Sequence, residues 1–184
     1  MKILVINAGS SSVKYHLYRM PQSEVLAMGF VERIGEDTSE LSHFFHGKTY
    51  TVPTKIEDVE KAMELILQTL VNKKVGVLRQ ISEISAVGHR VVHGGEEFTD
   101  SVVIDKKVIA SIEKFADLAP LHNPPNLAGI RAAQRHLPNT AQVACFDTAF
   151  HATIPKVAYM YALPYELYEK YGIRRYGFHG ISHR

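Results

Sequence analysis

A small polar turn follows the first apolar segment of the chain. Residues 4–14 read Leu-Val-Ile-Asn-Ala-Gly-Ser-Ser-Ser-Val-Lys. Gly9 permits backbone angles that a Cβ forbids, and the hydroxyls of Ser10, Ser11 and Ser12 can donate to anionic oxygens beside free backbone N–H groups. Lys14 adds a positive charge. These groups suit a bound phosphate, although an ordinary glycine and serine hairpin has the same composition.

The common nucleotide-binding P-loop is excluded at this turn. A Walker A sequence needs a second glycine followed by Lys and Ser or Thr, whereas Val13, Lys14 and Tyr15 stand here. Residues 12–19 alternate between apolar and polar side chains, which is the period of a half-buried strand. The turn is therefore predicted to join two antiparallel strands.

Two further charged side chains lie late in or directly after apolar segments. Arg90 lies near the end of the run Ile84–Val92, before His93 and two glycines, and its guanidinium suits a carboxylate or phosphate. Asp147 directly follows Ala141–Phe146. By these residues alone, Arg90 could equally pair with a nearby carboxylate, and Asp147 could simply cap the next turn.

Two histidine-containing segments complete the set of candidate groups. Pro120–Asn126 is a stiff loop that enters a helix, whose N-terminus favours an anion or a small polar substrate; alone, it is only a proline-started helix. His179 lies in a glycine-bounded segment and His183 follows four residues later, a spacing that a metal pair on a helix can use. No acidic third ligand follows, so a zinc-dependent hydrolase is the least favoured interpretation.

The expected elements explain how these groups could meet. Strands are predicted in the first apolar segment and over 12–19, 24–31, 84–92 and 141–146, with a ribbon over 41–52 that turns at Gly47–Lys48. Helices are predicted from a capping box at Thr54–Glu57 to about Asn72, from a cap at Asp105, and from Asn123. The inward helical residues are expected to be Ile56, Val59, Met63, Ile66, Leu67, Leu70, Val108, Ile109, Ile112, Phe115, Ala116, Leu127 and Ile130.

This order of elements predicts an α/β layer with a mixed sheet. Ligands collect outside the carboxyl ends of strands in open α/β sheets. Asn7, Arg90, Asp147 and the serine turn are all expected at such ends, so the sequence predicts that they gather there.

The composition limits the class of protein. The chain has 184 residues, 46% of them hydrophobic and 22% charged, and a net charge of +2. These values are typical of a soluble globular protein, and the scattered basic residues argue against nucleic-acid binding. No apolar run reaches membrane-spanning length and no secretory signal is visible, so a cytoplasmic location is expected. The single cysteine, Cys145, excludes an intrachain disulfide.

Five ordered motifs resemble the acetate kinase (acetokinase) family over essentially the whole chain. They are Asn7-Ala-Gly-Ser-Ser-Ser-Val-Lys14, His89-Arg-Val-Val-His-Gly-Gly95, Pro120-Leu-His-Asn-Pro-Pro125, Cys145-Phe-Asp-Thr-Ala-Phe-His151 and Arg175-Tyr-Gly-Phe-His-Gly-Ile-Ser-His183. The resemblance implies a ribonuclease-H-like core, shared with sugar kinases and actin. It also implies transfer of the γ-phosphoryl group of ATP to acetate, giving acetyl phosphate and ADP, with Mg²⁺ or Mn²⁺.

The resemblance also implies roles for particular residues. Asn7 corresponds to the magnesium-site residue, and Lys14 with Ser10 and Ser12 corresponds to the ATP-contacting group. Arg90 corresponds to the substrate-binding arginine. Asp147 corresponds to the active-site aspartate.

Further residues correspond to the stabilising and substrate-binding groups. His179 corresponds to the stabiliser of the transition state. Val92, Leu121 and His122 correspond to the acetate pocket. Acetate and propionate are not separated by these residues, because one methylene is worth only about 1–3 kcal/mol of discrimination.

Family members are longer than this chain, and the resemblance implies that they act as homodimers. We therefore expect a ribonuclease-H-like domain over 1–150 and the incomplete beginning of a second, nucleotide-binding domain over 151–184. An N-terminal half of this kind is expected to show little turnover alone. The open alternatives are a non-catalytic module that binds small anions or dimerises, and a kinase for propionate or another short-chain acid.

Overall fold

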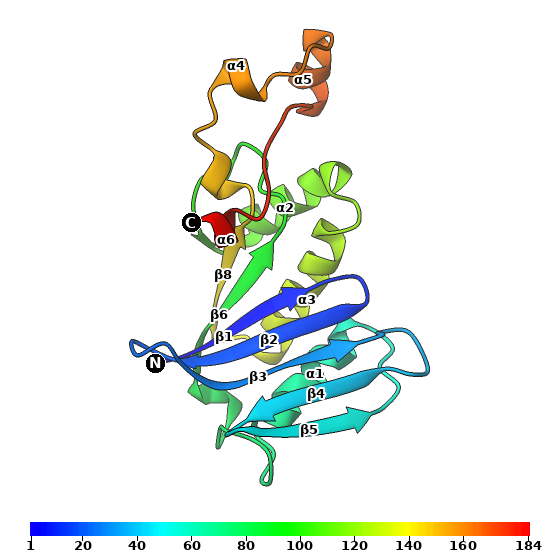
Figure 1. The fold of residues 1–184 in the computed structure, drawn as a ribbon, viewed down its shortest axis with the longest axis vertical. Helices are drawn as coiled ribbons and strands as arrows, with labels where there is room; N and C mark the ends of the chain where they lie inside the picture. Colours follow the sequence, from blue (N-terminus) through cyan, green and yellow to red (C-terminus); the bar gives the residue numbers. More distant parts are fainter.

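Eight strands form one mixed sheet in the computed structural model, which describes residues 1–184 (Figure 1). The strand order is β5-β4-β3-β2-β1-β6-β8-β7. Neighbours from β5 to β1 are antiparallel, β6 is parallel to β1, and β8 is parallel to β6. The bounds are β1 Lys2–Ala8, β2 Ser12–Arg19, β3 Glu24–Glu32, β4 Glu40–Phe45, β5 Lys48–Pro53, β6 Ile84–Val91, β7 Val102–Val103 and β8 Ala141–Phe146. The predicted α/β class with a mixed sheet is confirmed.

Three longer helices and several short ones accompany the sheet. The α-helices are α1 Val59–Leu70, α2 Lys106–Lys114, α3 Asn123–His136, α4 Lys156–Tyr159, α5 Tyr165–Tyr171 and α6 Gly180–His183, and the 3-10 turns are η1 Ile81–Glu83, η2 Phe115–Leu118 and η3 Ala149–His151. Helices α4 and α5 extend past the carboxyl end of the central strands (Figure 1). None of the helices combines the length and apolar character that a membrane crossing would need.

Two predicted details were wrong. Helix α1 does not start at a capping box over Thr54–Glu57, because the Asp58 carboxylate accepts from the Lys61 N–H at 2.8 Å and sets the start at Val59. The ribbon turns at His46–Gly47, not at Gly47–Lys48. Both His46 and Gly47 have positive φ angles (47° and 73°), as a type I′ hairpin turn requires.

Other boundaries were predicted well or missed altogether. Asp105 caps α2 as expected, accepting from the Val108 N–H at 2.8 Å. Phe115 and Ala116 lie in η2 rather than in α2, although Phe115 is still buried. The two-residue strand β7, which pairs antiparallel with β8, was not predicted, because two residues are too few to show a period.

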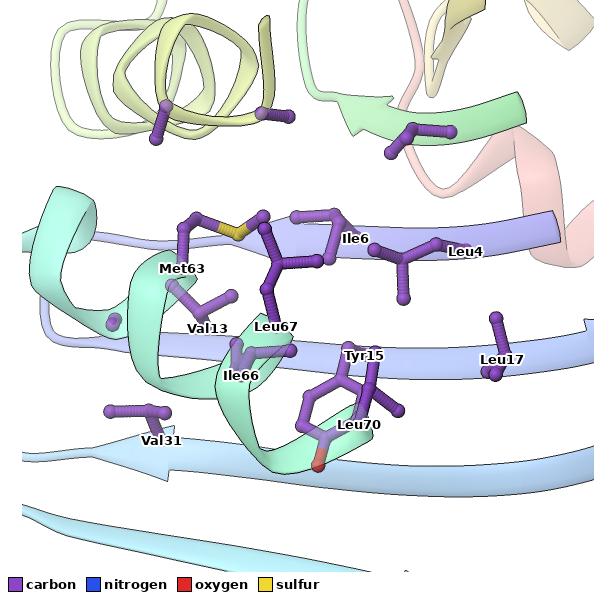
Figure 2. Close-up of a cluster of buried hydrophobic side chains, with 14 of the residues drawn as sticks. Leu4, Ile6, Val13, Tyr15, Leu17, Val31, Met63, Ile66, Leu67 and Leu70 are labelled. Atoms are coloured by element: carbon purple, nitrogen blue, oxygen red, sulfur yellow. The ribbon is translucent and has the colours of Figure 1, made fainter. Parts of the chain in front are cut away.

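The main core lies between one face of the sheet and helices α1 and α3. Figure 2 shows side chains of α1 packed against those of the first strands. Strands β1 and β2 contribute alternate residues and α1 contributes one helical face, all almost completely buried: Leu4, Ile6, Val13, Tyr15, Leu17, Met63, Ile66, Leu67 and Leu70. A second cluster, which includes Ile112, Ile130 and Phe146, joins α2 and α3 to β6 and β8. The predicted helical faces are therefore confirmed.

This packing determines which side chains lie on the other face of the sheet. Successive strand residues point to opposite faces. Because Ile6 and Ala8 point toward α1 and α3, Asn7 points away, and its register partner on β2 is Lys14. On β6, His89 and Val91 are buried on the helix side, so Arg90 lies on the same face as Asn7 and Lys14.

His89 makes unfolding depend on pH. Its Nε2 lies 2.8 Å from the Gln142 Oε1, and burial lowers the pKa of the imidazole to about 4. The unfolded chain takes up a proton near pH 6.5, so stability is full above that pH and falls as the pH drops toward 4, by up to about 3 kcal/mol. We expect His89→Gln to flatten this part of a pH series of urea unfolding curves. Burial also lowers the pKa of His43 and His93, so a smaller slope should remain. An unchanged slope would contradict the assignment.

Candidate active site

Arg90 and Asp147 form an ion pair at the carboxyl ends of β6 and β8. The Arg90 Nη2 donates to the Asp147 Oδ2 at 2.7 Å, and Nε lies 3.1 and 3.2 Å from the two carboxylate oxygens. The Asp147 side chain is 1% exposed and that of Arg90 is 32% exposed. The hydrogen bond to Asp147 raises the pKa of Arg90, against the opposing effect of partial burial. Arg90 is thus held in one orientation with part of its guanidinium open to solvent.

His179 lies above this pair in an unusual backbone conformation. Its φ of 56° is in the left-handed region, which non-glycine residues rarely adopt outside functional sites and turns. The Nδ1 atom is 4.0 Å from the Asp147 Oδ2, and the side chain is 73% exposed. The next residue, Gly180, donates its N–H to the Asp147 carbonyl at 2.9 Å and so holds His179 close to the end of β8.

One cavity of about 360 Å³ brings together six of the predicted site residues. Arg90, Val92, Leu121, His122, Asp147 and His179 line it, together with Phe178 and the segment Leu118–Pro120. Arg90 and His179 contribute polar nitrogens, while Val92 and Leu121 contribute apolar surface. A small carboxylate with a short apolar tail matches this division.

The predicted phosphate-binding residues lie at the neighbouring strand ends and do not line this cavity. The N–H of Gly9 donates to the Ser12 carbonyl at 2.7 Å and closes a tight turn between β1 and β2. Ser10 and Lys14 are exposed, and Asn7 and Ser12 are half-buried. Since Asn7 and Lys14 share a sheet face with Arg90, the two groups of residues lie on one face of the sheet.

Two buried asparagines in the first turn of α3 hold these strand ends. Asn123 is 0% exposed and bonds to both backbone groups of His93: its Oδ1 accepts from the N–H at 3.1 Å and its Nδ2 donates to the carbonyl at 3.0 Å. Asn126 accepts from the Val92 N–H and donates to the Ala8 carbonyl. Sequence patterns predict Asn123 only as a helix start and assign no role to Asn126. The spacing of three residues between them, beside a proline pair, was the available signal.

His93 supports the loop that carries His179. It is 1% exposed, and its Nδ1 accepts from the Gly95 N–H at 3.0 Å. Its ring lies 4.4 Å from that of Tyr176 and 5.6 Å from that of Phe178, measured between centroids. Burial lowers the pKa of His93 to about 4, so the ring is neutral at pH 7 and acts by packing and not by charge.

The chain places no three His, Cys, Asp or Glu side chains where they could hold a metal ion together. The Asp147 carboxylate is already bonded to Arg90. Asn7 offers a single amide oxygen, a ligand type that suits Mg²⁺ when phosphates and water supply the rest. The residues present therefore fit a magnesium ion that arrives bound to a polyphosphate.

Comparison with known proteins follows this geometry closely. A family model described as the acetokinase family matches residues 2–184. The acetate kinase of Clostridium kluyveri is 59% identical over 184 residues, which are 100% of this chain and 45% of that protein. The acetate kinase of Thermotoga maritima is 56% identical over the same length and is covered to 46%. The chain thus spans about half the length of these curated relatives.

Solved structures give the same result for the fold. The acetate kinase of Porphyromonas gingivalis has a TM-score of 0.95 at 49% identity, with 99% of this chain and 46% of that chain covered. A propionate kinase from Francisella tularensis has a TM-score of 0.92 at 40% identity, with the same coverage. The fold expected from the sequence motifs is therefore confirmed.

Proposed function

The chain belongs to the acetokinase family, and from this premise we propose that it forms the acetate side of a site that transfers a phosphoryl group between ATP and acetate. The products are acetyl phosphate and ADP, and the reaction is reversible. The observation that carries the proposal is the cavity in which the Arg90 guanidinium faces the apolar surface of Val92 and Leu121. In this arrangement Arg90 binds the carboxylate, and the apolar wall takes the methyl group.

The chemistry asks these residues for charge and orientation, not for a base. Acetate has a pKa near about 4, so it is already ionised and nucleophilic at pH 7. Its difficulty is the approach to a negatively charged phosphoryl group. Arg90 and His179 offset this charge on the acetate side, and Lys14 offsets it on the side of the serine turn. Asp147 orients the Arg90 fork and need not take a proton.

Magnesium enters this proposal as part of the nucleotide substrate. Mg²⁺ bound to ATP neutralises charge on the phosphates. Asn7 is the residue of this chain that we propose to contact it, while the Ser10–Ser12 turn and Lys14 contact the phosphates. Manganese could replace magnesium with the same hard oxygen ligands.

The nucleotide side needs more than residues 1–150 provide. We propose that residues 151–184 begin a second, nucleotide-binding domain, since they add no strand to the sheet. They are attached to the loop after β6 by the ion pair of Arg174 with Glu96, and the Arg174 guanidinium lies 3.5 Å from the centre of the Tyr159 ring. We therefore expect this chain alone to show little or no acetyl phosphate formation.

Calorimetric titration of the chain with acetate, acetyl phosphate and MgATP tests the proposal. We expect the two small anions to bind through Arg90 and MgATP to bind weakly. Tight, magnesium-dependent ATP binding would contradict the assignment of the adenosine site to a part outside this chain. If neither small anion binds, the acetate site itself is wrong. Turnover at rates typical of kinases, about 1–100 s⁻¹, would contradict the expected lack of activity.

Propionate is a second candidate acceptor. The structural similarity to a propionate kinase favours it, and the cavity of about 360 Å³ has room for one more methylene. Propionate should then bind within about 1–3 kcal/mol of acetate. A non-catalytic anion-binding module remains the alternative from another class, and it predicts anion binding without turnover in any longer form of the protein.

A further inference from the structure

We propose that Asn126 is a positioning residue that sets the spacing between the serine turn and the acetate cavity. The inference rests on the proposed function, because it assumes that the phosphoryl group is held by the turn and acetate by the cavity. Asn126 touches neither substrate in this scheme. It acts through the backbone of the two strand ends that carry the substrate-binding groups.

One amide group joins these two strand ends. The Asn126 Nδ2 donates to the Ala8 carbonyl at 2.7 Å, and its Oδ1 accepts from the Val92 N–H at 3.0 Å. Ala8 ends β1 immediately before the Gly9–Ser12 turn, and Val92 follows β6 and lines the cavity. Because the amide is planar, its donor and acceptor are held at a fixed separation.

The position of this link along the strands gives it its importance. The pairing of β1 with β6 ends at Ile6 and His89, so no ladder pair joins the two strands where the candidate groups stand. Asn126 connects the strands just beyond that point. The bond also satisfies a backbone carbonyl and a backbone N–H that would otherwise be left without partners near the core. Asn126 is itself only 5% exposed.

Helix α3 provides the rigid base that this role needs. A Cβ added to Gly129 would lie 2.6 Å from the Ala8 Cβ, so the helix rests directly on the end of β1. At the start of the helix, Asn123 bonds to His93 and also donates to the Ile112 carbonyl at 3.2 Å. Asn123 therefore fixes α3 to the β6 side alone, whereas Asn126 fixes both sides.

Phosphoryl transfer is sensitive to this spacing. A misplacement of about 1 Å between reacting groups can cost about a hundredfold in rate. Acetate contacts only the cavity side in the proposed scheme, while acetyl phosphate spans the cavity and the serine turn. Loss of the Ala8 bond should therefore affect the two ligands differently.

Asn126→Asp tests the proposal, with Asn123→Asp as the matched control. A carboxylate at 126 still accepts from Val92 but cannot donate to Ala8. We expect NMR titration to show acetyl phosphate affinity lowered about tenfold and acetate affinity changed less than about threefold. The backbone amide signals of Ser10–Ser12 should shift and show faster motion. In Asn123→Asp these signals should stay as in the wild type, while those near His93 change.

A second variant and a ligand-free readout keep the test decisive. Asn126→Ala removes both bonds without burying a charge, and it should weaken acetyl phosphate more than acetate in the same way. Equal weakening of the two ligands, or wild-type signals from Ser10–Ser12 in both variants, would overturn the proposal. If the wild-type chain binds neither ligand, the proposed function fails. The Ser10–Ser12 amide signals then decide on Asn126 by themselves: changed signals support the link and unchanged ones overturn it.

Discussion

Replacing Arg90 with alanine is expected to weaken acetate and acetyl phosphate binding at least about a hundredfold. Hydrogen bonds to charged groups contribute about 1.5–3 kcal/mol each, and about 1.4 kcal/mol corresponds to a factor of ten in affinity. Asp147 occupies Nε and Nη2 of the guanidinium, which leaves Nη1 to reach the ligand carboxylate. Calorimetric titration of wild type and variant measures the loss.

The same substitution should also destabilise the fold. The Asp147 side chain is 1% exposed, so without Arg90 a carboxylate remains buried and unpaired. Losing one partner of a buried pair typically costs about 3–5 kcal/mol. We expect urea unfolding of Arg90→Ala to show a loss of this order. In Arg90→Ala/Asp147→Asn most of the stability should return, because the buried charge has been removed.

The double variant separates binding from folding. Its stability should approach that of the wild type while its affinity for acetate stays low, because the guanidinium is absent. Arg90→Lys should be intermediate in binding, since an ammonium keeps the charge but not the planar fork. If Arg90→Ala/Asp147→Asn folds stably and binds acetate with wild-type affinity, Arg90 does not bind the carboxylate.

Replacing Gly180 with alanine is expected to weaken acetyl phosphate binding by about tenfold or more. The added Cβ would lie 2.3 Å from the Asp147 carbonyl oxygen and 2.7 Å from the Phe150 Cβ, and neither is a flexible side-chain end. Residues 179–184 would have to move away from the end of β8, and the hydrogen bond of the Gly180 N–H to Asp147 would be lost. His179 would then leave its position 4.0 Å from the Asp147 carboxylate.

Gly88→Ala is the matched control for this substitution. Gly88 lies in β6, and an added Cβ there meets nothing within 4 Å. This variant should bind acetyl phosphate as the wild type does. In Gly180→Ala the thermal midpoint should change little, because α6 has only four residues and its detachment is a local event. Wild-type acetyl phosphate affinity in Gly180→Ala would show that His179 is not needed for binding.

Much of the fold could be read from local patterns. The alternation over residues 12–19 predicted β2, the apolar run 141–146 predicted β8, and Asp105 predicted the start of α2. These features depend on side chains only a few residues apart, so they are visible in the sequence itself. The start of α1 was misplaced because two candidate caps, Thr54 and Asp58, lie within about one helical turn of each other, and only the connection from β5 decides between them.

The amino-acid sequence by itself determined the α/β class, the order of elements and the residue types at the strand ends, because each follows from periodicity and from close neighbours. The tertiary structure decided how those residues meet. The pairing of Arg90 with Asp147 joins positions 57 residues apart, and the bond of Asn126 to Ala8 joins positions 118 apart. Such contacts depend on strand register and on the seating of α3 over β1, which arise only when the whole sheet is packed.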